Sequence, residues 1–469
     1  MLTAVAMHSR REQVALVVAL SLLALLFLTG GASRADALSQ PLARLASLAV
    51  IAVAIFLFDR AAWLRARVPF LFIAALAAVM IIQLVPLPPA FWHVLPGQER
   101  HAAALASIQL GGIWRPMSLT PDGTVNSLLA LLPALAAILI VSLLPRQAMP
   151  ILLGAILCGI VLSGLFGALQ LSSGSGYLYR ITSEGSAVGL FANRNHQALL
   201  LACGLPMLAA WAVLPRKDAA YHRLQFWLSL CAAAAVYPLL LITGSRAGLA
   251  LGALATAGGG LIVWSGARFL PGDARIRGRL LCLALVPISV AMLATAATIM
   301  LSRDEALQRV LGGVEDELRI DLLPVIWQMA RDFFPAGAGF GAFDTVYRMY
   351  EPVASLDSQY LNHAHNDWLQ IVVEGGLPTL LIVTVGFILY LLASAAVWRR
   401  GVVSTTELMG RTASIVLFAM MVASIGDYPL RTPTMSALFV IAAVWLAQAW
   451  QAPAERRGNA GVGSPQRLG

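Results

Sequence analysis

The segment His363-Ala364-His365-Asn366-Asp367 places two imidazole groups next to a strongly apolar stretch. An unperturbed imidazole titrates near about pH 6.5, which suits the removal of a proton from a hydroxyl group. Spaced two apart, the rings would share one side of an extended chain but point in different directions on a helix. No His, Cys or carboxylate spacing nearby completes a metal site, so we expect none. The alternative is a pair of hydrogen-bonded histidines at a membrane surface.

A second candidate is Arg246 in Gly244-Ser245-Arg246-Ala247-Gly248, between two apolar runs. A charge at a membrane surface usually has an anionic partner, and the planar guanidinium group can bind a phosphate with two hydrogen bonds. Ser245 and the N–H groups at the start of the next helix would add to such an anion site. The alternative is an arginine in contact with lipid headgroups. Gly248 and Gly252 form a GxxxG pattern that favours helix packing.

Further polar residues lie in other short connections. Asn195 and His196 open an apolar run, where they could cap a helix or bind sugar hydroxyls or phosphate. Asp427 and Arg431 precede the last apolar run, and they could pair with each other or help to form the same polar cavity. Arg319 lies among acidic residues, so salt bridges on a solvated helix are an alternative to a functional role.

These residues must be positioned by membrane-spanning helices. The chain has 469 residues, of which 59% are hydrophobic and 12% charged. Apolar runs of about 20 residues recur along it, each long enough to cross a bilayer, and only helices satisfy their own backbone in lipid at this composition. We predict an all-α polytopic fold with twelve spans, at about 13–31, 44–58, 69–86, 124–144, 150–171, 195–214, 225–243, 247–266, 280–301, 376–397, 411–426 and 434–450.

Arginine and lysine in the short loops predict the orientation. The loops after the second, sixth, eighth and tenth spans, and the residues before the first, are rich in these residues. All of them fall on one side if both termini are cytoplasmic. The net charge of +9 therefore reflects membrane topology, and nucleic-acid binding is not needed to explain it. The N-terminus resembles a signal peptide, but its apolar run is longer than usual, which favours an uncleaved anchor.

Two long segments are expected on the opposite, outer side, at about 87–123 and 302–375. Loops of this length usually serve a function. The second is predicted to be partly helical, over Asp304–Leu311 and Asp321–Phe334. Glycines at 337, 339 and 341 then predict a tight turn against the membrane domain. We assign 1–451 to one polytopic membrane domain and expect the polar tail 452–469 to be disordered and cytoplasmic.

Together these residues resemble the O-antigen ligase / O-antigen polymerase (Wzy-type) superfamily of bacterial membrane glycosyltransferases. The resemblance covers about 150–435 and is carried by 244–248, by Arg319 followed by Trp327 and 335–343, and by the pattern of His365-Asn366 followed by Gly376-Leu377-Pro378-Thr379. Family members share a twelve-span, GT-C-like layout with a large periplasmic loop between the ninth and tenth spans.

The resemblance implies transfer of a glycan from an undecaprenyl-diphosphate carrier to an acceptor hydroxyl in the periplasm. The reaction would invert the anomeric carbon and need no metal ion or cofactor. Arg246 and Arg319 would hold the leaving diphosphate, and His365 would be the base. Substrate-binding candidates are Asn195, His196, Ser245, His363, Asn366, Asp427 and Arg431.

The acceptor stays open between lipid A-core, a growing polysaccharide and a protein, and membrane lipids would surround the enzyme. A bacterial inner-membrane location is implied, with the site facing the periplasm. The alternatives are a protein O-oligosaccharyltransferase or, from a different class, a twelve-span transporter of polysaccharide or lipid. Against the transporter, the expected spans contain almost no Asp or Glu for ion coupling.

Overall fold

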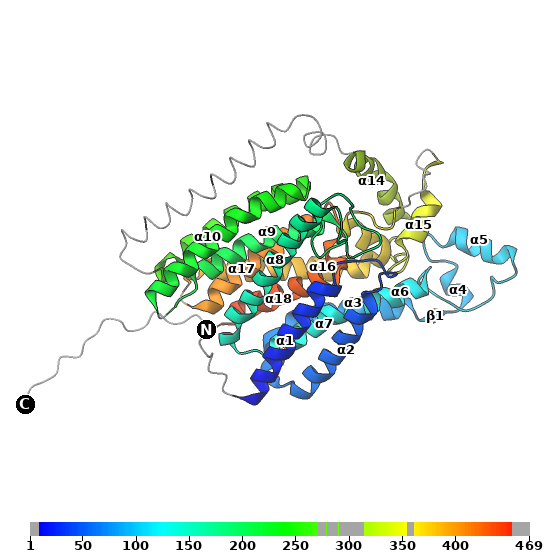
Figure 1. Cartoon of the computed structure of the whole chain (residues 1–469). Helices are drawn as coiled ribbons and strands as arrows, with labels where there is room; N and C mark the ends of the chain where they lie inside the picture. Colours follow the sequence, from blue (N-terminus) through cyan, green and yellow to red (C-terminus); the bar gives the residue numbers. More distant parts are fainter. Residues whose placement is uncertain are drawn as a thin grey trace, which may run out of the picture.

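The computed structural model describes residues 9–216, 218–270, 278, 289, 314–353, 361–402 and 404–452, with the backbone alone for 314–321. Within these ranges the chain is an elongated bundle of helices (Figure 1). Eleven segments are long and apolar enough to cross a membrane, which confirms the all-α polytopic membrane fold. The predicted ninth span at 280–301, the helix Asp304–Leu311 and the tail after residue 452 lie outside the described residues.

The membrane-spanning segments follow the hydropathy pattern closely. They are α1 (Arg10–Thr29), α2 (Gln40–Leu57), α3 (Arg60–Gln83), α6 with α7 (Pro121–Leu129, Leu132–Ser142), α8 (Met149–Ser173), α9 (Arg194–Val213), α10 (Ala219–Ile242), α11 (Arg246–Gly266), α16 (Asp367–Arg399), α17 (Thr405–Ala423) and α18 (Pro433–Gln451). Among them, α9, α17 and α18 are the most enclosed, with about four fifths or more of the apolar window buried. These three helices form the centre of the bundle.

The two largest errors in the predicted boundaries are at the starts of α3 and α16, which begin nine residues earlier because charged residues belong to these helices rather than to loops. Helix α3 begins at Arg60, where Asp59 accepts a hydrogen bond from the N–H of Ala62 at 2.7 Å. Arg65 lies inside α3 and donates to the carbonyl of Ser142 at 2.8 Å. Helix α16 begins at Asp367, nine residues before the predicted span, and bends at Gly376, whose φ is +57°. A hydropathy window excludes such polar helical turns.

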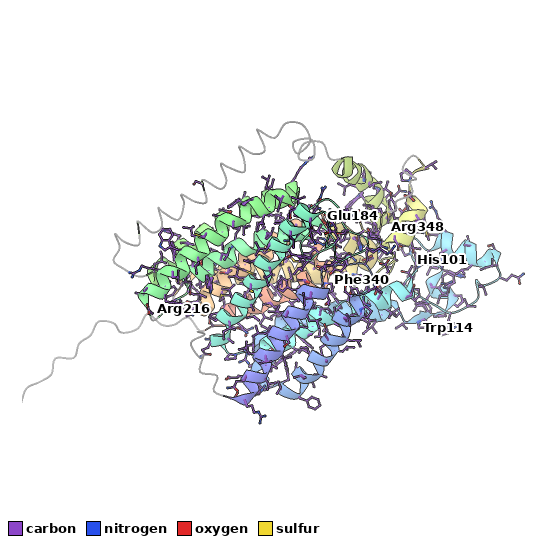
Figure 2. All side chains as sticks on the ribbon, viewed as in Figure 1. His101, Trp114, Glu184, Arg216, Phe340 and Arg348 are labelled. Carbon is purple, nitrogen blue, oxygen red and sulfur yellow. The ribbon has the colours of Figure 1, made fainter. Side chains whose placement is uncertain are left out.

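The chain crosses the bundle back and forth, and its contacts fix which helix ends meet. At one end, the carbonyls of Gly30 and Gly31 accept from the N–H groups of Thr434 and Ala192, so the end of α1 meets the starts of α18 and α9. We call this the loop end, because the long connections gather there. Figure 2 shows His101, Trp114 and Arg348 beyond the loop end and Arg216 at the opposite end, as the sequence predicts.

The loop end carries the smaller elements. They are the antiparallel pair β1 (Pro86–Leu87) and β2 (Arg115–Pro116), α4 (Pro89–Trp92), α5 (Glu99–Ser107), α14 (Val314–Phe333) and α15 (Phe343–Tyr350). A separate apolar cluster joins α14, α15 and the first turns of α16, with Ile326, Phe333 and Val346 almost fully buried. This second core holds the loop elements against the bundle.

The glycine-rich stretch between α14 and α15 forms the predicted tight turn. Gly337, Gly339 and Gly341 all have positive φ, between +79° and +102°. A Cβ on Gly339 would lie 2.2 Å from Oγ of Ser118, and a Cβ on Gly337 would lie 2.6 Å from the carbonyl of Glu374. Only glycine fits both the backbone conformation and the space. The turn therefore locks the loop elements onto α16.

Candidate functional site

The first turns of α16 present a row of polar side chains at the loop end. Asn366 is the N-cap residue and accepts from the N–H of Leu369 at 3.0 Å. Asp367, Gln370 and Glu374 are spaced three and four residues apart, so they share one face of the helix. All three are buried, and Glu374 is completely buried. A helix carries such groups inside a protein only where partners compensate them.

Arg431, in the connection before α18, is the main partner of these carboxylates. Its Nε donates to Asp367 at 2.8 Å and its Nη2 to Glu374 at 3.3 Å. Burial opposes a charge on Arg431, but Glu374 and Asp367 outweigh it and raise the pKa of the guanidinium above its ordinary value. Arg431 is therefore a fixed cation that joins the α17–α18 connection to α16.

Asp427 lies in the same connection but turns to a different set of residues. Its carboxylate accepts from Nδ2 of Asn195 at 2.9 Å, and it lies 3.6 Å from Nε2 of His196 and 3.5 Å from Nδ1 of His365. Burial alone would raise the pKa of Asp427, but His196 and His365 hold it well below its usual range. Asp427 is thus an ionised carboxylate facing two imidazoles.

Of the two alternatives for Asn195 and His196, capping of α9 is wrong. Helix α9 begins at Arg194, and the cap is Asn193, whose side-chain oxygen accepts from the N–H of Asn195 at 2.7 Å. The helix starts one residue earlier than its apolar run, so the next two side chains lie in its first turn. Their side chains are consequently free of the capping role and turn towards Asp427.

His363 and His365 lie in the turn that leads into α16, and both rings pack against Tyr428. The ring centroids are 4.4 Å and 4.8 Å from that of Tyr428, and His196 packs on the same ring at 5.3 Å. His365 has a φ of +48°, a conformation that non-glycine residues rarely adopt. Such backbone strain persists where the surroundings fix it, often at functional sites.

Arg246 opens α11 at the loop end, where Ser245 is the cap and accepts from the N–H of Gly248 at 3.0 Å. Helix α11 packs closely on α9, since a Cβ on Gly248 would lie 2.3 Å from Cβ of Ala198. This close approach brings Arg194, the first residue of α9, to the same place: its Nη1 lies 3.9 Å from where a Cβ on Gly244 would be. Arg194 and Arg246 therefore lie at two helix N-termini that are close together.

Arg319 belongs to α14 and lies near the start of that helix. The structure describes its backbone but not its side chain.

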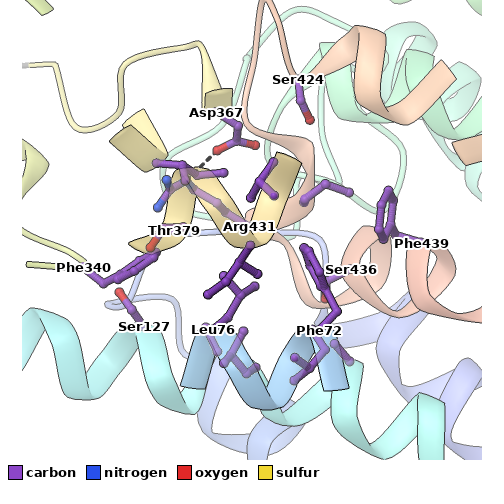
Figure 3. A pocket seen from close by; sticks show the side chains of 18 of the residues that line it. Phe72, Leu76, Ser127, Phe340, Asp367, Thr379, Ser424, Arg431, Ser436 and Phe439 are labelled. Atoms are coloured by element: carbon purple, nitrogen blue, oxygen red, sulfur yellow. Dashed lines mark hydrogen bonds and ion pairs between the residues drawn. The ribbon is translucent and has the colours of Figure 1, made fainter. Parts of the chain in front are cut away.

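A cavity of about 1220 Å³ begins at the polar row of α16 and continues between α3, α16 and α18. Figure 3 shows Asp367 and Arg431 on one side of it and Phe72, Leu76 and Phe439 on another. His363 also lines it. Along α18 the lining runs from Ser436 to Trp450, which is about 21 Å at the helical rise of 1.5 Å per residue. The cavity therefore joins a polar region to a long apolar wall.

Sequence reasoning missed several residues of this site. Arg194, directly before Asn195, was not considered, and Gln370, Glu374 and Tyr428 were not singled out either. The helical spacing of Asp367, Gln370 and Glu374 was a usable signal, but the expected span began only at 376. Asp427 and Arg431 were expected to pair or to share a cavity. Instead each binds its own partners, and of the two only Arg431 lines the cavity.

Fold and site define a multi-pass membrane protein with a buried polar cluster at one end. Residues 226–384, about a third of the chain, match the family model described as O-Antigen ligase. This match identifies the region as O-antigen ligase-type and confirms the resemblance to the O-antigen ligase / O-antigen polymerase superfamily. It includes Arg246, Arg319 and both histidines of the 363–367 segment, whereas Asn195, Asp427 and Arg431 lie outside it. No curated protein matches the chain.

Proposed function

We propose that this protein transfers a glycan from an undecaprenyl-diphosphate carrier to an acceptor hydroxyl, at the periplasmic face of a bacterial inner membrane. The observation that carries the proposal is the proximity of His365, which lies in the family-matched region, to the ionised carboxylate of Asp427 at 3.5 Å. Both termini are cytoplasmic in this proposal, which places the loop end in the periplasm.

Arg194 and Arg246 provide the site for the donor's diphosphate. Both lie at helix N-termini, where the backbone dipole favours an anion. Each guanidinium group can bind phosphate oxygens with two hydrogen bonds. As the glycosidic bond breaks, negative charge grows on the diphosphate, so these groups stabilise the transition state more than the ground state. Arg319 is the third candidate for this role. No metal ion is required for charge stabilisation of this kind.

His365 takes the proton from the acceptor hydroxyl. Its Nδ1 lies 3.5 Å from Oδ1 of Asp427, and in the proposed mechanism this nitrogen carries the proton while Nε2 holds the lone pair. The acceptor oxygen attacks the anomeric carbon as its proton passes to Nε2. The bond from that carbon to the phosphate oxygen breaks, and undecaprenyl diphosphate leaves with the electron pair. A single displacement inverts the anomeric carbon. Asp427 stabilises the imidazolium that forms.

The cavity between α3, α16 and α18 receives the acceptor. Its lining contains five carboxylates, those of Asp36, Asp122, Asp344, Asp367 and Glu374, but only two guanidinium groups, those of Arg34 and Arg431. A diphosphate would be repelled there, whereas a hydroxyl-rich glycan can donate hydrogen bonds to carboxylates. The carboxylate-lined cavity therefore favours the acceptor, and the site formed by Arg194 and Arg246 favours the donor. In this proposal His365 lies between the two sites.

Transfer by the purified protein tests the proposal. Membranes from a strain that lacks the gene hold both the accumulated lipid-linked glycan and the native acceptor. Wild-type protein added to these membranes should consume the lipid-linked glycan and release undecaprenyl diphosphate, while His365→Ala should not. Equal rates for the two proteins, or movement of intact lipid-linked glycan across the membrane without cleavage, would favour the transporter alternative.

A further inference from the structure

Gln370 has a side-chain amide whose orientation is fixed by its neighbours. Its Oε1 accepts from the N–H of Ala364 at 2.9 Å, and a backbone N–H can only donate. On the other side, its Nε2 lies 3.0 Å from the carboxylate of Glu374. A flipped amide would place an NH₂ group against an N–H and an oxygen against a carboxylate. Nε2 therefore faces Glu374, and its second hydrogen is available for a further acceptor.

That acceptor is Nδ1 of His363, at 3.3 Å from Nε2 of Gln370. Because the amide can only donate from Nε2, Nδ1 of His363 must accept and cannot carry a proton. Burial lowers the pKa of His363 well below its ordinary value, and the charge of Arg431 adds to the effect. The imidazole is therefore neutral, with its one proton on Nε2. His363 is mostly enclosed by its neighbours but keeps part of its surface exposed, and it lines the cavity.

The two histidines thus differ in chemistry although they are two residues apart. In the proposed function His365 carries its proton on Nδ1, beside a carboxylate, and a lone pair on Nε2, whereas His363 faces an amide donor through Nδ1, which leaves an N–H on Nε2. One imidazole can accept a proton and the other can only donate a hydrogen bond. Both rings pack on Tyr428, so the two imidazoles lie close to each other.

We propose that His363 is a neutral hydrogen-bond donor to an oxygen of the acceptor glycan, and that Gln370 is the positioning residue that holds it in this form. The proposal rests on the proposed function, because the acceptor is taken to occupy the cavity. Gln370 acts through His363 and is not itself a catalytic residue. Glu374 and Ala364 in turn hold Gln370 in place.

Two replacements of His363 separate the possible roles. Glutamine carries an NH₂ group close to the position of Nε2, whereas leucine fills a similar volume without a donor. In membranes of the deletion strain, we expect His363→Gln to keep transfer within about tenfold of wild type and His363→Leu to lose about 100-fold, as for loss of one aligned donor. Loss in both variants would mean that His363 is a base. Near-normal rates in both would mean that it only fills space.

The positioning role of Gln370 predicts an altered pH profile. A carboxylate at position 370 would also face Glu374, so the two groups are exchanged in the variant Gln370→Glu/Glu374→Gln. There a carboxylate faces Nδ1, so that nitrogen keeps a proton at all working pH values. At low pH the imidazolium still donates through Nε2, but at high pH Nε2 loses its proton. The transfer rate of this variant should therefore fall as pH rises, with a decrease that wild type lacks. The same variant with His363→Gln added should lack this decrease, since the imidazole is gone. A decrease that persists without His363 would overturn the proposal.

The tautomer can be measured without any activity. Histidine labelled with ¹⁵N gives different shifts for protonated and unprotonated ring nitrogens, and comparison with His363→Gln assigns the signal among the seven histidines. We expect Nε2–H and bare Nδ1 in wild type near pH 7.5. A proton on Nδ1 would refute the assignment even if the protein proves to be an active transferase. Conversely, the expected tautomer in a protein without transfer activity would leave the geometry intact and reject the proposed function.

Discussion

Nδ1 of His365 and Oδ1 of Asp427 lie 3.5 Å apart although they are 62 residues apart in the chain. The contact exists because the turn before α16 and the connection before α18 meet at the loop end, where the N–H of Asp367 donates to the carbonyl of Ser424 at 2.9 Å. In the proposed mechanism, a carboxylate in this position orients the ring of its histidine and favours a proton on Nδ1. The pair forms the centre of the proposed site.

If His365 and Asp427 act as a unit, their substitutions should not add. Asp427→Asn keeps the size of the side chain but removes its charge, and we expect the turnover rate to fall at least about 100-fold with little change in KM. The double variant with His365→Ala should be hardly slower than His365→Ala alone. Initial rates of donor consumption measure this cycle. If the rate losses of the two single variants multiply in the double variant, the two residues act independently.

The ability of Arg246 to bind phosphate with two hydrogen bonds should matter more for the transfer rate than its positive charge. Arg246→Lys keeps a cation but loses bidentate binding, so we expect transfer to fall by about 100-fold. Arg194→Lys should behave in the same way, because Nη1 of Arg194 lies beside Gly244, two residues before Arg246. Arg180→Lys is the matched control, since that side chain is 81% exposed in a salt bridge with Asp36. Near-normal transfer by Arg246→Lys would contradict the role assigned to it.

Metal independence is tested by chelation. The diphosphate is stabilised by guanidinium groups in this account, so EDTA should leave the transfer rate unchanged. The measurement is donor consumption with EDTA and with EDTA followed by Mg²⁺. Activity that disappears with EDTA and returns with Mg²⁺ would require a metal ion in the mechanism.

The glycine turn should be essential for stability. Gly339→Ala places a Cβ 2.2 Å from Oγ of Ser118 in a backbone of φ +102°, and we expect the free energy of unfolding to fall by about 2 kcal/mol or more. Gly112→Ala is the control, because a Cβ there meets no heavy atom within 4 Å. Thermal unfolding in detergent compares the two. Equal midpoints would mean that the turn is not rigid.

His363 should make stability depend on pH. Its pKa is lowered in the folded protein, so the unfolded state binds more protons below about pH 6.5. Its contribution is therefore fully present above that pH and is lost as pH falls towards the folded pKa. The unfolding midpoint of wild type should decrease between about pH 7 and 5 more steeply than that of His363→Gln. Parallel curves would argue against a buried neutral imidazole.

The sequence predicted the membrane class and the apolar part of all eleven described spans from hydropathy alone, because lipid imposes a length and composition on each helix. For α3 and α16 it missed the first nine residues of the helix, and in α16 it predicted only the part after Gly376. The first turns, with Asp367 and Glu374, read as loop because their charges are compensated only by Arg431, which is distant in sequence.

The sequence predicted part of the site, namely candidate residues but not the contacts between them. His365, Asp427 and Asn195 were each candidates, since polar residues at span ends are few. Their contacts depend on which helix ends meet, and a single sequence does not contain that information. The role of Gln370 was hidden, because only the positions of Ala364, Glu374 and His363 around it give its amide a direction.

The most direct test of the account is the glycan profile of a strain deleted for this gene and complemented with wild type or with His365→Ala. Lipopolysaccharide, secreted polysaccharide and glycoproteins would be compared, together with the lipid-linked precursor. We predict that one glycan class is lost, that its lipid-linked precursor accumulates, and that only wild type restores the class. Full restoration by His365→Ala would contradict the proposed base and the transferase mechanism built on it.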